Sequence, residues 1–248
     1  MKKTATTLLA IGALAALIAT QASAASLLSE TFTYPNGNLA PNGGWAIHSG
    51  SGTDIQVVSA AAAGDMSTGP DDNRTFPAQT GVKVYYCFTA TIADPGGSPS
   101  ANYFIHLKDS GTSNFAARVF VVPQGATFSF GLAVAQSTFQ VQWPTALAYG
   151  QPYQVVVMYD PSTPAPTAKL WVAPNAEADP SIICTGGTAQ TISSIALRQS
   201  NTVTPAGSKL WKYTVDDIGV GLSFSDACIA GPTPTHSSTW GSIKTIYR

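Results

Sequence analysis

Short β-type runs, broken at intervals by turn residues, constrain the fold of this chain most. Seven runs rich in Val, Thr and aromatic residues stand out, at residues 83–92, 103–108, 116–122, 127–134, 154–159, 168–172 and 213–222. Turn clusters such as Asp94-Pro95-Gly96-Gly97 and Asp109-Ser110-Gly111 separate them. The three-and-four spacing of an amphipathic helix is almost absent. We therefore predict an all-β fold, a sandwich of two antiparallel sheets of the jelly-roll kind. Because no βαβ alternation occurs, a nucleotide-binding α/β fold is excluded.

The first 24 residues have the composition of a secretory signal peptide. Lys2 and Lys3 precede an apolar run over residues 8–19, and Ala22-Ser23-Ala24 matches a signal-peptidase site. The apolar run is shorter than the roughly 20 residues that span a bilayer. We predict a secreted or cell-surface protein with a signal peptide over 1–24, a sandwich domain over 25–230 and no membrane span in the mature chain.

Charged residues are scarce and scattered. The chain has 12 basic residues, so removing Lys2 and Lys3 leaves 10 against 13 acidic ones, a formal charge of −3. Proteins that hold phosphate backbones gather Lys and Arg on one face, whereas these occur singly from Arg74 to Arg248. Nucleic acid is therefore not an expected partner.

Three cysteines follow the leader: Cys87, Cys184 and Cys228. An odd number allows one internal disulfide at most, and an oxidising compartment favours its formation. We favour Cys184 with Cys228, because both lie in Gly-flanked segments late in the chain. Cys87, inside a strand-like run, is expected to be a small buried apolar residue. Three free thiols remain the open alternative.

Several segments combine Gly, Trp and strand residues in a characteristic order. They are residues 28–34 with 42–45, 103–109, 115–120, 169–174 and 215–221. In that order they resemble a concanavalin A-like, laminin G-like jelly-roll module of exported bacterial proteins, over residues 26 to 226. The resemblance implies two stacked, curved antiparallel sheets, a use in carbohydrate or surface-protein recognition and frequently no catalytic role. Because a fold does not fix a function, the site has to be argued from its own residues.

The carboxylates argue against hydrolysis of glycosidic bonds, which normally needs two acids about 5 to 9 Å apart across the sugar. Glu30 and Glu177 are the two glutamates, and no Glu-x-Asp-x-Glu strand like that of jelly-roll glucanases occurs. Asp216 and Asp217 are adjacent on a predicted strand, so they point to opposite faces. Motifs of serine hydrolases and zinc proteases are missing too. We predict a protein that is not an enzyme; the alternative is a polysaccharide-degrading enzyme with an atypical carboxylate pair.

A structural calcium ion is the candidate cofactor. Its proposed ligands are Glu30 on the first predicted strand and Asp217 on the last, because these strands often neighbour each other in sandwiches and calcium prefers carboxylate oxygens. Both residues fit an ordinary solvated strand equally well. Asp71-Asp72-Asn73 also has a calcium-like composition but lacks the spaced Asp-x-Asp-x-Asp-Gly pattern, so we interpret it as a turn.

Alternation along two strands predicts a polar surface. Tyr103, Ile105 and Leu107 should face the core, which turns Phe104, His106 and Lys108 outward. In the next strand Asn114, Arg118 and Phe120 should share one face. The candidate ligand-binding residues are therefore His106, Lys108, Asn114 and Arg118, beside the two rings, with Trp143 as a stacking residue. Rings beside hydrogen-bond donors suit sugars or an acidic polymer, and an ordinary solvated sheet face is the alternative.

Residues 231–248 stand apart from the predicted domain. Gly231-Pro232-Thr233-Pro234-Thr235 is a stiff, extended linker, and Ser238 is placed to cap a short helix. The end of the chain looks like the short C-terminal tags of some exported bacterial proteins, which predicts a sorting or attachment partner. As a whole, the sequence predicts a secreted non-catalytic module that recognises a glycan or cell-surface polymer, or contributes to extracellular structural assembly.

Overall fold

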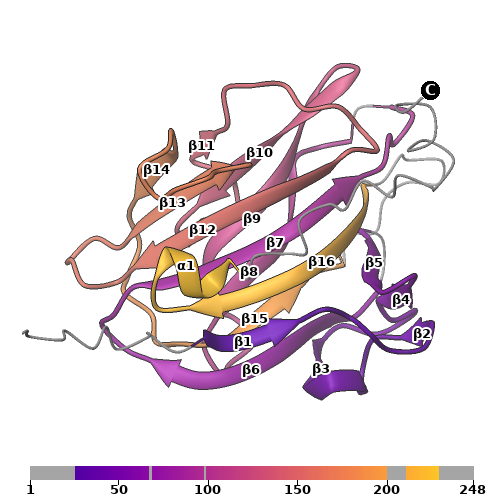
Figure 1. Ribbon diagram of the computed structural model, residues 1–248, viewed down its shortest axis with the longest axis horizontal. Helices are drawn as coiled ribbons and strands as arrows, with labels where there is room; N and C mark the ends of the chain where they lie inside the picture. The colour runs from indigo at the N-terminus through magenta and orange to yellow at the C-terminus, as the bar shows by residue number, and fades with distance from the viewer. Residues whose placement is uncertain (1–25, 67–68, 98, 200–210, 229–248) are drawn as a thin grey trace, which may run out of the picture.

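The computed structural model describes residues 26–66, 69–97, 99–199 and 211–228 (Figure 1). These residues form a sandwich of two antiparallel sheets, which confirms the predicted fold class. The predicted leader (1–24) and the linker and tail (231–248) lie outside the described residues. Within the described part of the chain, no helix has the length and hydrophobicity needed to cross a bilayer.

One sheet has nine strands over the described residues. In order they are β14 (Ile182–Thr185), β13 (Thr167–Val172), β12 (Pro152–Asp160), β7 (Val84–Ile92), β16 (Lys212–Gly221), β5 (Ala61–Asp65), β4 (Gln56–Val58) and β2 (Gly37–Asn38), and β1 (Ser26–Glu30) pairs with β16 beside β5. The first and last strands are therefore neighbours, as expected. A 3-10 turn, η1 (Asn42–Gly44), follows β2.

The other sheet has seven strands over the described residues. Their order is β11 (Val141–Gln142), β10 (Thr127–Ala133), β9 (Phe115–Gln124), β8 (Asn102–Lys108), β15 (Ile192–Leu197), β6 (Asp71–Gln79) and β3 (Trp45–Ser49). All seven runs predicted from the sequence are strands, with ends shifted by one or two residues. The interpretation of Asp71-Asp72-Asn73 as a turn is wrong, because these residues open β6.

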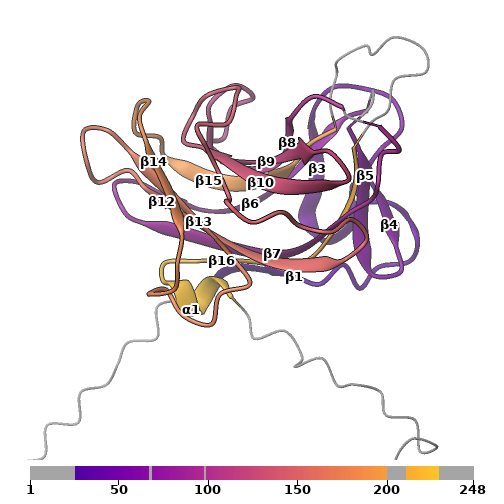
Figure 2. The same ribbon diagram turned by 90° about the horizontal axis from the view of Figure 1, so that it is seen from above.

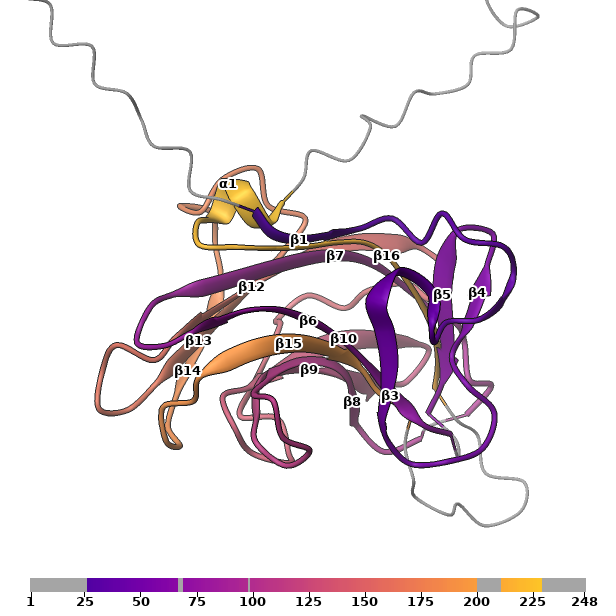
Figure 3. The same ribbon diagram turned by 90° about the horizontal axis from the view of Figure 1, so that it is seen from below.

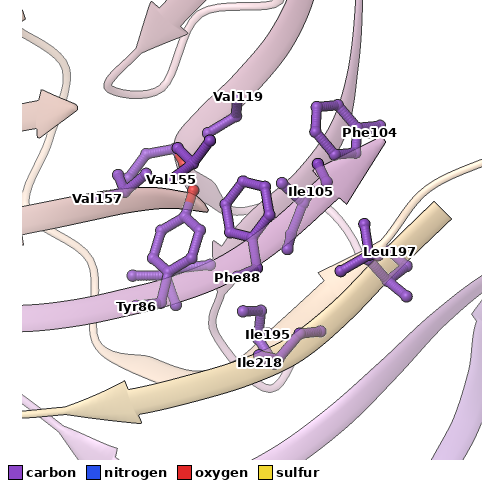
Figure 4. Packing of buried hydrophobic residues seen from close by; sticks show 14 of the residues in the cluster. Tyr86, Phe88, Phe104, Ile105, Val119, Val155, Val157, Ile195, Leu197 and Ile218 are labelled. Atoms are coloured by element: carbon purple, nitrogen blue, oxygen red, sulfur yellow. Dashed lines mark hydrogen bonds between the residues drawn. The ribbon is translucent and has the colours of Figure 1, made fainter. Parts of the chain in front are cut away.

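The hydrophobic core lies between the two sheets (Figure 4). The nine-stranded sheet contributes Tyr86, Phe88, Val155 and Val157, and the seven-stranded sheet Phe104, Ile105, Val119, Ile195 and Leu197. Each such side chain contributes about 1.5–3 kcal/mol when it leaves water. The Tyr86 hydroxyl also donates a hydrogen bond across the core to the Ala117 carbonyl, 2.5 Å away.

A bulge in β8 reverses part of the predicted alternation. The pairing of β8 with β9 shifts between Tyr103 and Ile105 and again before Leu107. Phe104 and Ile105 both join the core, whereas Tyr103 packs outside the sheet with Phe120. The expected positions of Tyr103 and Phe104 are therefore exchanged, because one extra residue in a strand breaks its period of two.

A short helix, α1 (Phe224–Ala227), packs on part of the outer face of the nine-stranded sheet (Figures 2 and 3). Phe224 and Cys228 pack there against Tyr85, Cys87 and Trp171. Cys87 is 2% exposed, which confirms its prediction as a buried apolar residue. Cys184 instead lies in the core between the sheets. The favoured Cys184–Cys228 pairing is therefore wrong, because the two residues lie on opposite faces of one sheet.

Candidate binding face on the seven-stranded sheet

The outer face of the seven-stranded sheet gathers aromatic and basic side chains from four segments. We call this surface the cationic face. Its members are His48 of β3, Tyr103, His106 and Lys108 of β8, Phe115 and Arg118 of β9, and Arg198 at the end of β15. Ser194 of β15 lies opposite Lys108 in the pairing of β15 with β8 and belongs to the same surface.

Ring contacts hold the cationic face together. The ring centroids of His106 and Phe115 are 4.3 Å apart, and those of Tyr103 and His106 are 5.5 Å apart. The guanidinium carbons of Arg118 and Arg198 lie 4.8 Å and 4.1 Å from the centroid of the Tyr103 ring. Tyr103 is thus contacted by two cations, an arrangement that fixes both guanidinium groups through cation–π attraction.

The three cations of this face hydrogen-bond to neutral oxygens. Lys108 Nζ donates to the Asp109 carbonyl at 2.9 Å, Arg118 Nη1 to the Gln136 carbonyl at 3.0 Å, and Arg198 Nη1 to Asn102 Oδ1 at 2.8 Å. None of the three forms an ion pair within the described residues, where the ion pairs are Arg74–Glu30 and Lys83–Asp160. Basic residues that are scattered in the sequence therefore concentrate positive charge on one surface.

Both histidines of the cationic face are neutral at neutral pH. Burial, together with the positive charge of the nearby Lys108, lowers the pKa of His48 to about 4. Burial also holds the pKa of His106 well below its usual value, helped by His48 and Arg118. A neutral imidazole carries one N–H donor and one acceptor nitrogen, so this face offers both kinds of hydrogen-bonding group beside fixed cations.

Unsatisfied polar atoms concentrate on this surface. Within the described residues, eight buried side-chain nitrogen and oxygen atoms lack a hydrogen-bond partner. Six of the eight belong to the cationic face, namely both ring nitrogens of His48 and of His106, Arg118 Nε and Ser194 Oγ. Because buried polar groups are nearly always paired in folded proteins, such a concentration marks a place where water or a ligand completes the bonding.

The structure brings together three of the five predicted ligand-binding residues. His106, Lys108 and Arg118 all lie on the cationic face, 0%, 2% and 8% exposed. Asn114 is exposed in the loop between β8 and β9, where its amide donates to Asp109 Oδ2 at 2.7 Å. Trp143 follows β11 and packs, half-buried, against the core between the sheets. Within the described residues, the hydrogen bonds of Trp143 go to Ser129 and Phe130 of β10, not to the cationic face.

Sequence reasoning missed five residues of this face, namely His48, Tyr103, Phe115, Ser194 and Arg198. Arg198 directly follows a buried strand, and His48 lies next to the end of the strand Trp45–Ser49. Alternation along each strand could have assigned the side chains of Arg198 and His48 to an outer face. No local sequence pattern, however, shows that β3, β15 and β8 lie near one another in the sheet. Tyr103 was placed in the core because the bulge of β8 carries no sequence signature.

Glu30 is surrounded by donors. Its Oε1 accepts from the backbone N–H of Phe32 at 2.6 Å, and its Oε2 accepts from the Tyr34 hydroxyl at 2.9 Å and Trp45 Nε1 at 2.8 Å, and from Arg74 Nη1. We call this group the Glu30 network. It ties β1 of one sheet to β3 and β6 of the other.

Calcium at Glu30 and Asp217 stays a prediction. Asp217 lies one residue before the partner of Glu30 in the pairing of β1 with β16, and it adopts a positive φ of 51°. Within the described residues, no group of three His, Cys, Asp or Glu side chains is arranged to hold a metal ion. The donors around Glu30 already give its carboxylate a structural role without an ion.

A pair of carboxyl groups occurs elsewhere, between Asp54 and Asp72. Asp72 is fully buried, and burial, helped by the neighbouring Asp54 and Asp71 carboxyl groups, raises its pKa to about 8. Neither Asp72 oxygen receives an N–H donor within the described residues. A fully buried carboxyl group is closed to a sugar ring, unlike the acids of a glycosidase, which flank the bond that they cleave.

A cavity of about 630 Å³ lies at the β4–β5 end of the nine-stranded sheet. Its lining includes Asp54, Gln56, Thr91, Lys212 and Tyr213. It is therefore formed by the other sheet from the one that carries the cationic face, and Asp72 is not part of its lining.

Comparisons with known proteins agree on the fold. The sequence matches no protein-family model and no curated protein. Among solved structures, the CBM2 module of the evolved Dit of Lactobacillus casei BL23 phage J-1 matches with a TM-score of 0.51 and 11% identity, covering 80% of this chain and 96% of that one. Botulinum neurotoxin type C, whose cell entry depends on interaction with two ganglioside molecules, matches with a TM-score of 0.50 and 12% identity.

The second match spans 80% of this chain but 48% of the toxin chain, so this chain corresponds to about half of it. A more distant likeness, to alginate lyase vAL-1 from a Chlorella virus, has a TM-score of 0.47 at 5% identity and does not bear on activity. At these identities the matches show a shared β-sandwich fold.

Proposed function

We propose that this protein is a secreted, non-catalytic module that binds an anionic glycan on the cationic face. The single observation that carries the proposal is the concentration of six unpartnered buried polar atoms beside three cations that have no ion-pair partner within the described residues. A ligand that supplies both hydroxyls and negative charge would satisfy both groups at once.

The chemistry of the face fits a sugar acid better than a neutral sugar. Guanidinium groups bind carboxylate or sulfate oxygens through paired, charge-assisted hydrogen bonds, and Lys108 adds a further cation. The neutral His48 and His106 can exchange hydrogen bonds with hydroxyls. The rings of Tyr103 and Phe115 supply apolar surface for the C–H groups of a sugar.

The fold supports this proposal at a coarser level. The solved structures that share it include a CBM2 module and a toxin whose cell entry involves gangliosides. The rival proposal, a polysaccharide-degrading enzyme with an atypical carboxylate pair, has Asp54 and Asp72 as its acids. The full burial of Asp72 favours binding over catalysis.

A binding experiment with matched polymers tests the proposal. The purified protein is titrated calorimetrically with a uronic-acid polymer, a neutral glucan of similar length and a single-stranded DNA of similar charge. We expect binding to the uronic-acid polymer, weaker binding to DNA and none to the glucan. Equal binding to DNA would mean general polyanion recognition, and no binding to any polymer would favour a structural role.

Two variants locate the site. Arg118→Gln should weaken binding about tenfold or more, since it removes a charge-assisted hydrogen-bond donor worth roughly 1.5–3 kcal/mol. Lys212→Gln is the matched control, because it removes one cation from the cavity of the nine-stranded sheet and should leave the affinity unchanged. If Lys212→Gln weakened binding and Arg118→Gln did not, the binding site would lie in that cavity instead. Release of new reducing or unsaturated ends from the polymer would instead establish the enzymatic alternative.

A further inference from the structure

We propose that Cys87 and Cys228 form a disulfide in the exported protein and thereby fasten α1 to strand β7. The inference is independent of ligand binding, and it depends on the predicted export. It assigns the single internal disulfide that three cysteines allow to a different pair from the one that the sequence favours.

The two thiols meet on the outer face of the nine-stranded sheet. Cys87 lies in the middle of β7, between its neighbours Val156 of β12 and Gly219 of β16. Cys228 directly follows α1 and packs against the same apolar cluster. Both cysteines are free thiols in the structure and belong to one packed apolar cluster, and the nearby Cys228 thiol, together with burial, raises the pKa of Cys87. The two thiols are therefore neighbours in the folded chain.

Packing around α1 holds Cys228 in this place. The Phe224 ring makes edge contacts with Trp171 and Tyr85, at centroid distances of 5.6 Å and 6.5 Å. Ser223 caps the helix by accepting from the backbone N–H of Asp226 at 3.2 Å. A Cβ on Gly221 would lie 2.6 Å from Asp226, so only glycine lets α1 approach β16 this closely.

The third cysteine is not placed to compete. Cys184 lies on the inner face of the same sheet, 7% exposed, with its Sγ 4.0 Å from the Leu132 carbonyl. Because β-sheet residues on opposite faces are separated by the backbone layer, neither Cys87 nor Cys228 can reach it without unfolding. Cys184 is therefore the free thiol that an odd number of cysteines requires.

Bond formation is a thiol–disulfide exchange with an external disulfide as the oxidant, such as oxidised glutathione or an oxidoreductase of the exported compartment. The half-buried Cys228 loses its proton and attacks the oxidant, which releases one carrier thiol and leaves a mixed disulfide. Cys87 then loses its proton and attacks the Cys228 sulfur, which releases the second carrier thiol. Two protein thiols are oxidised and one disulfide is reduced.

The bond would fasten the chain at the last residue that the structure describes. α1 has four residues, and residues 229–248 follow Cys228 directly. Short terminal elements open readily when non-covalent contacts alone hold them. A bond to β7 would transmit any pull on the C-terminal segment to an interior strand of the sheet.

Mass spectrometry of the full-length chain tests the pairing. The exported protein, or the chain incubated in a glutathione redox buffer, is denatured, alkylated without reduction and digested. We expect one alkylated cysteine, Cys184, and one linked peptide pair that contains Cys87 and Cys228. Three alkylated cysteines, or a linked pair that contains Cys184, would overturn the proposal.

Thermal unfolding tests the role of the bond. Reductant should lower the Tm of the wild type and of Cys184→Ala by roughly 5 °C or more, because the bond closes a long loop. It should leave the Tm of Cys228→Ser unchanged. An equal response of Cys228→Ser to reductant would show that the effect does not come from this disulfide.

Discussion

At the residue scale, Glu30 joins the two sheets at one edge of the sandwich. Glu30→Gln keeps the size of the side chain, but it removes the negative charge that pairs with Arg74 and one hydrogen-bond acceptor. We therefore expect the free energy of unfolding to fall by about 2–4 kcal/mol. Denaturant titration measures this change. Glu177→Gln, which alters a single hydrogen bond with Tyr85, is the comparison and should cost about 1 kcal/mol.

The same variants separate the Glu30 network from a calcium site. If the network alone stabilises the edge, a chelator leaves the wild-type Tm unchanged, and Glu30→Gln is destabilised equally with and without chelator. If calcium binds at Glu30 and Asp217, chelator lowers the wild-type Tm, and both Glu30→Gln and Asp217→Asn abolish that response.

Asp72 makes stability depend on pH. Its pKa is about 8 when folded and about 3.8 when unfolded, so the folded state binds the extra proton between these values. This contribution to stability is complete below about pH 4 and is lost as the pH rises toward 8, with a slope of at most about 1.4 kcal/mol per pH unit. We expect Asp72→Asn to flatten the profile and to be more stable than the wild type at pH 8. Denaturant titrations at pH 5 and pH 8 measure the difference, and parallel profiles would contradict it.

At the scale of elements, one hydrogen bond crosses the core between β7 and β9. The Tyr86 hydroxyl donates to the carbonyl of Ala117, a residue with a positive φ of 49° whose N–H bonds to Val134 outside the regular ladder. Tyr86→Phe leaves that buried carbonyl without its donor, so we expect a loss of about 1–3 kcal/mol in the free energy of unfolding. Phe88→Leu, which alters packing without a hydrogen bond, is the control for volume.

The sequence predicted seven of the sixteen strands in the described residues as runs, but it did not predict the local irregularities or most of the shorter strands. Runs such as 84–92 and 213–221 alternate or are apolar throughout and end at Gly or Pro, which predicts strands. The bulge that exchanges Tyr103 and Phe104 depends on pairing with β9, a long-range property. β6 was missed because Asp71, Asp72 and Asn73 are poor strand formers, and here burial beside Ser49, Gln199 and Asp54 overrides propensity.

At the scale of the whole molecule, the order of the strands assembles the cationic face. Alternation placed His106, Lys108 and Arg118 on one surface because β8 and β9 form a hairpin. The contributions of β3 and β15 depend on which strands become neighbours, which no local pattern contains. The same limit applies to Cys87 and Cys228, which are distant in sequence and meet because β7 and β16 are adjacent.

Binding by this face should respond to salt and pH in a particular way. We use a sulfated glycan, whose charge does not titrate over this range. Affinity should fall between 0.1 and 1 M salt, as the Debye length shrinks from about 10 Å to about 3 Å.

The affinity for the sulfated glycan should be constant from pH 6 to 8, because His48 and His106 both stay neutral there. Below about pH 5 it should rise, since a bound anion raises the pKa of His48 and protonation therefore favours binding. Calorimetric titration of the wild type and His48→Gln measures this rise, which the variant should lack. Affinity that falls on acidification would place the anion away from His48.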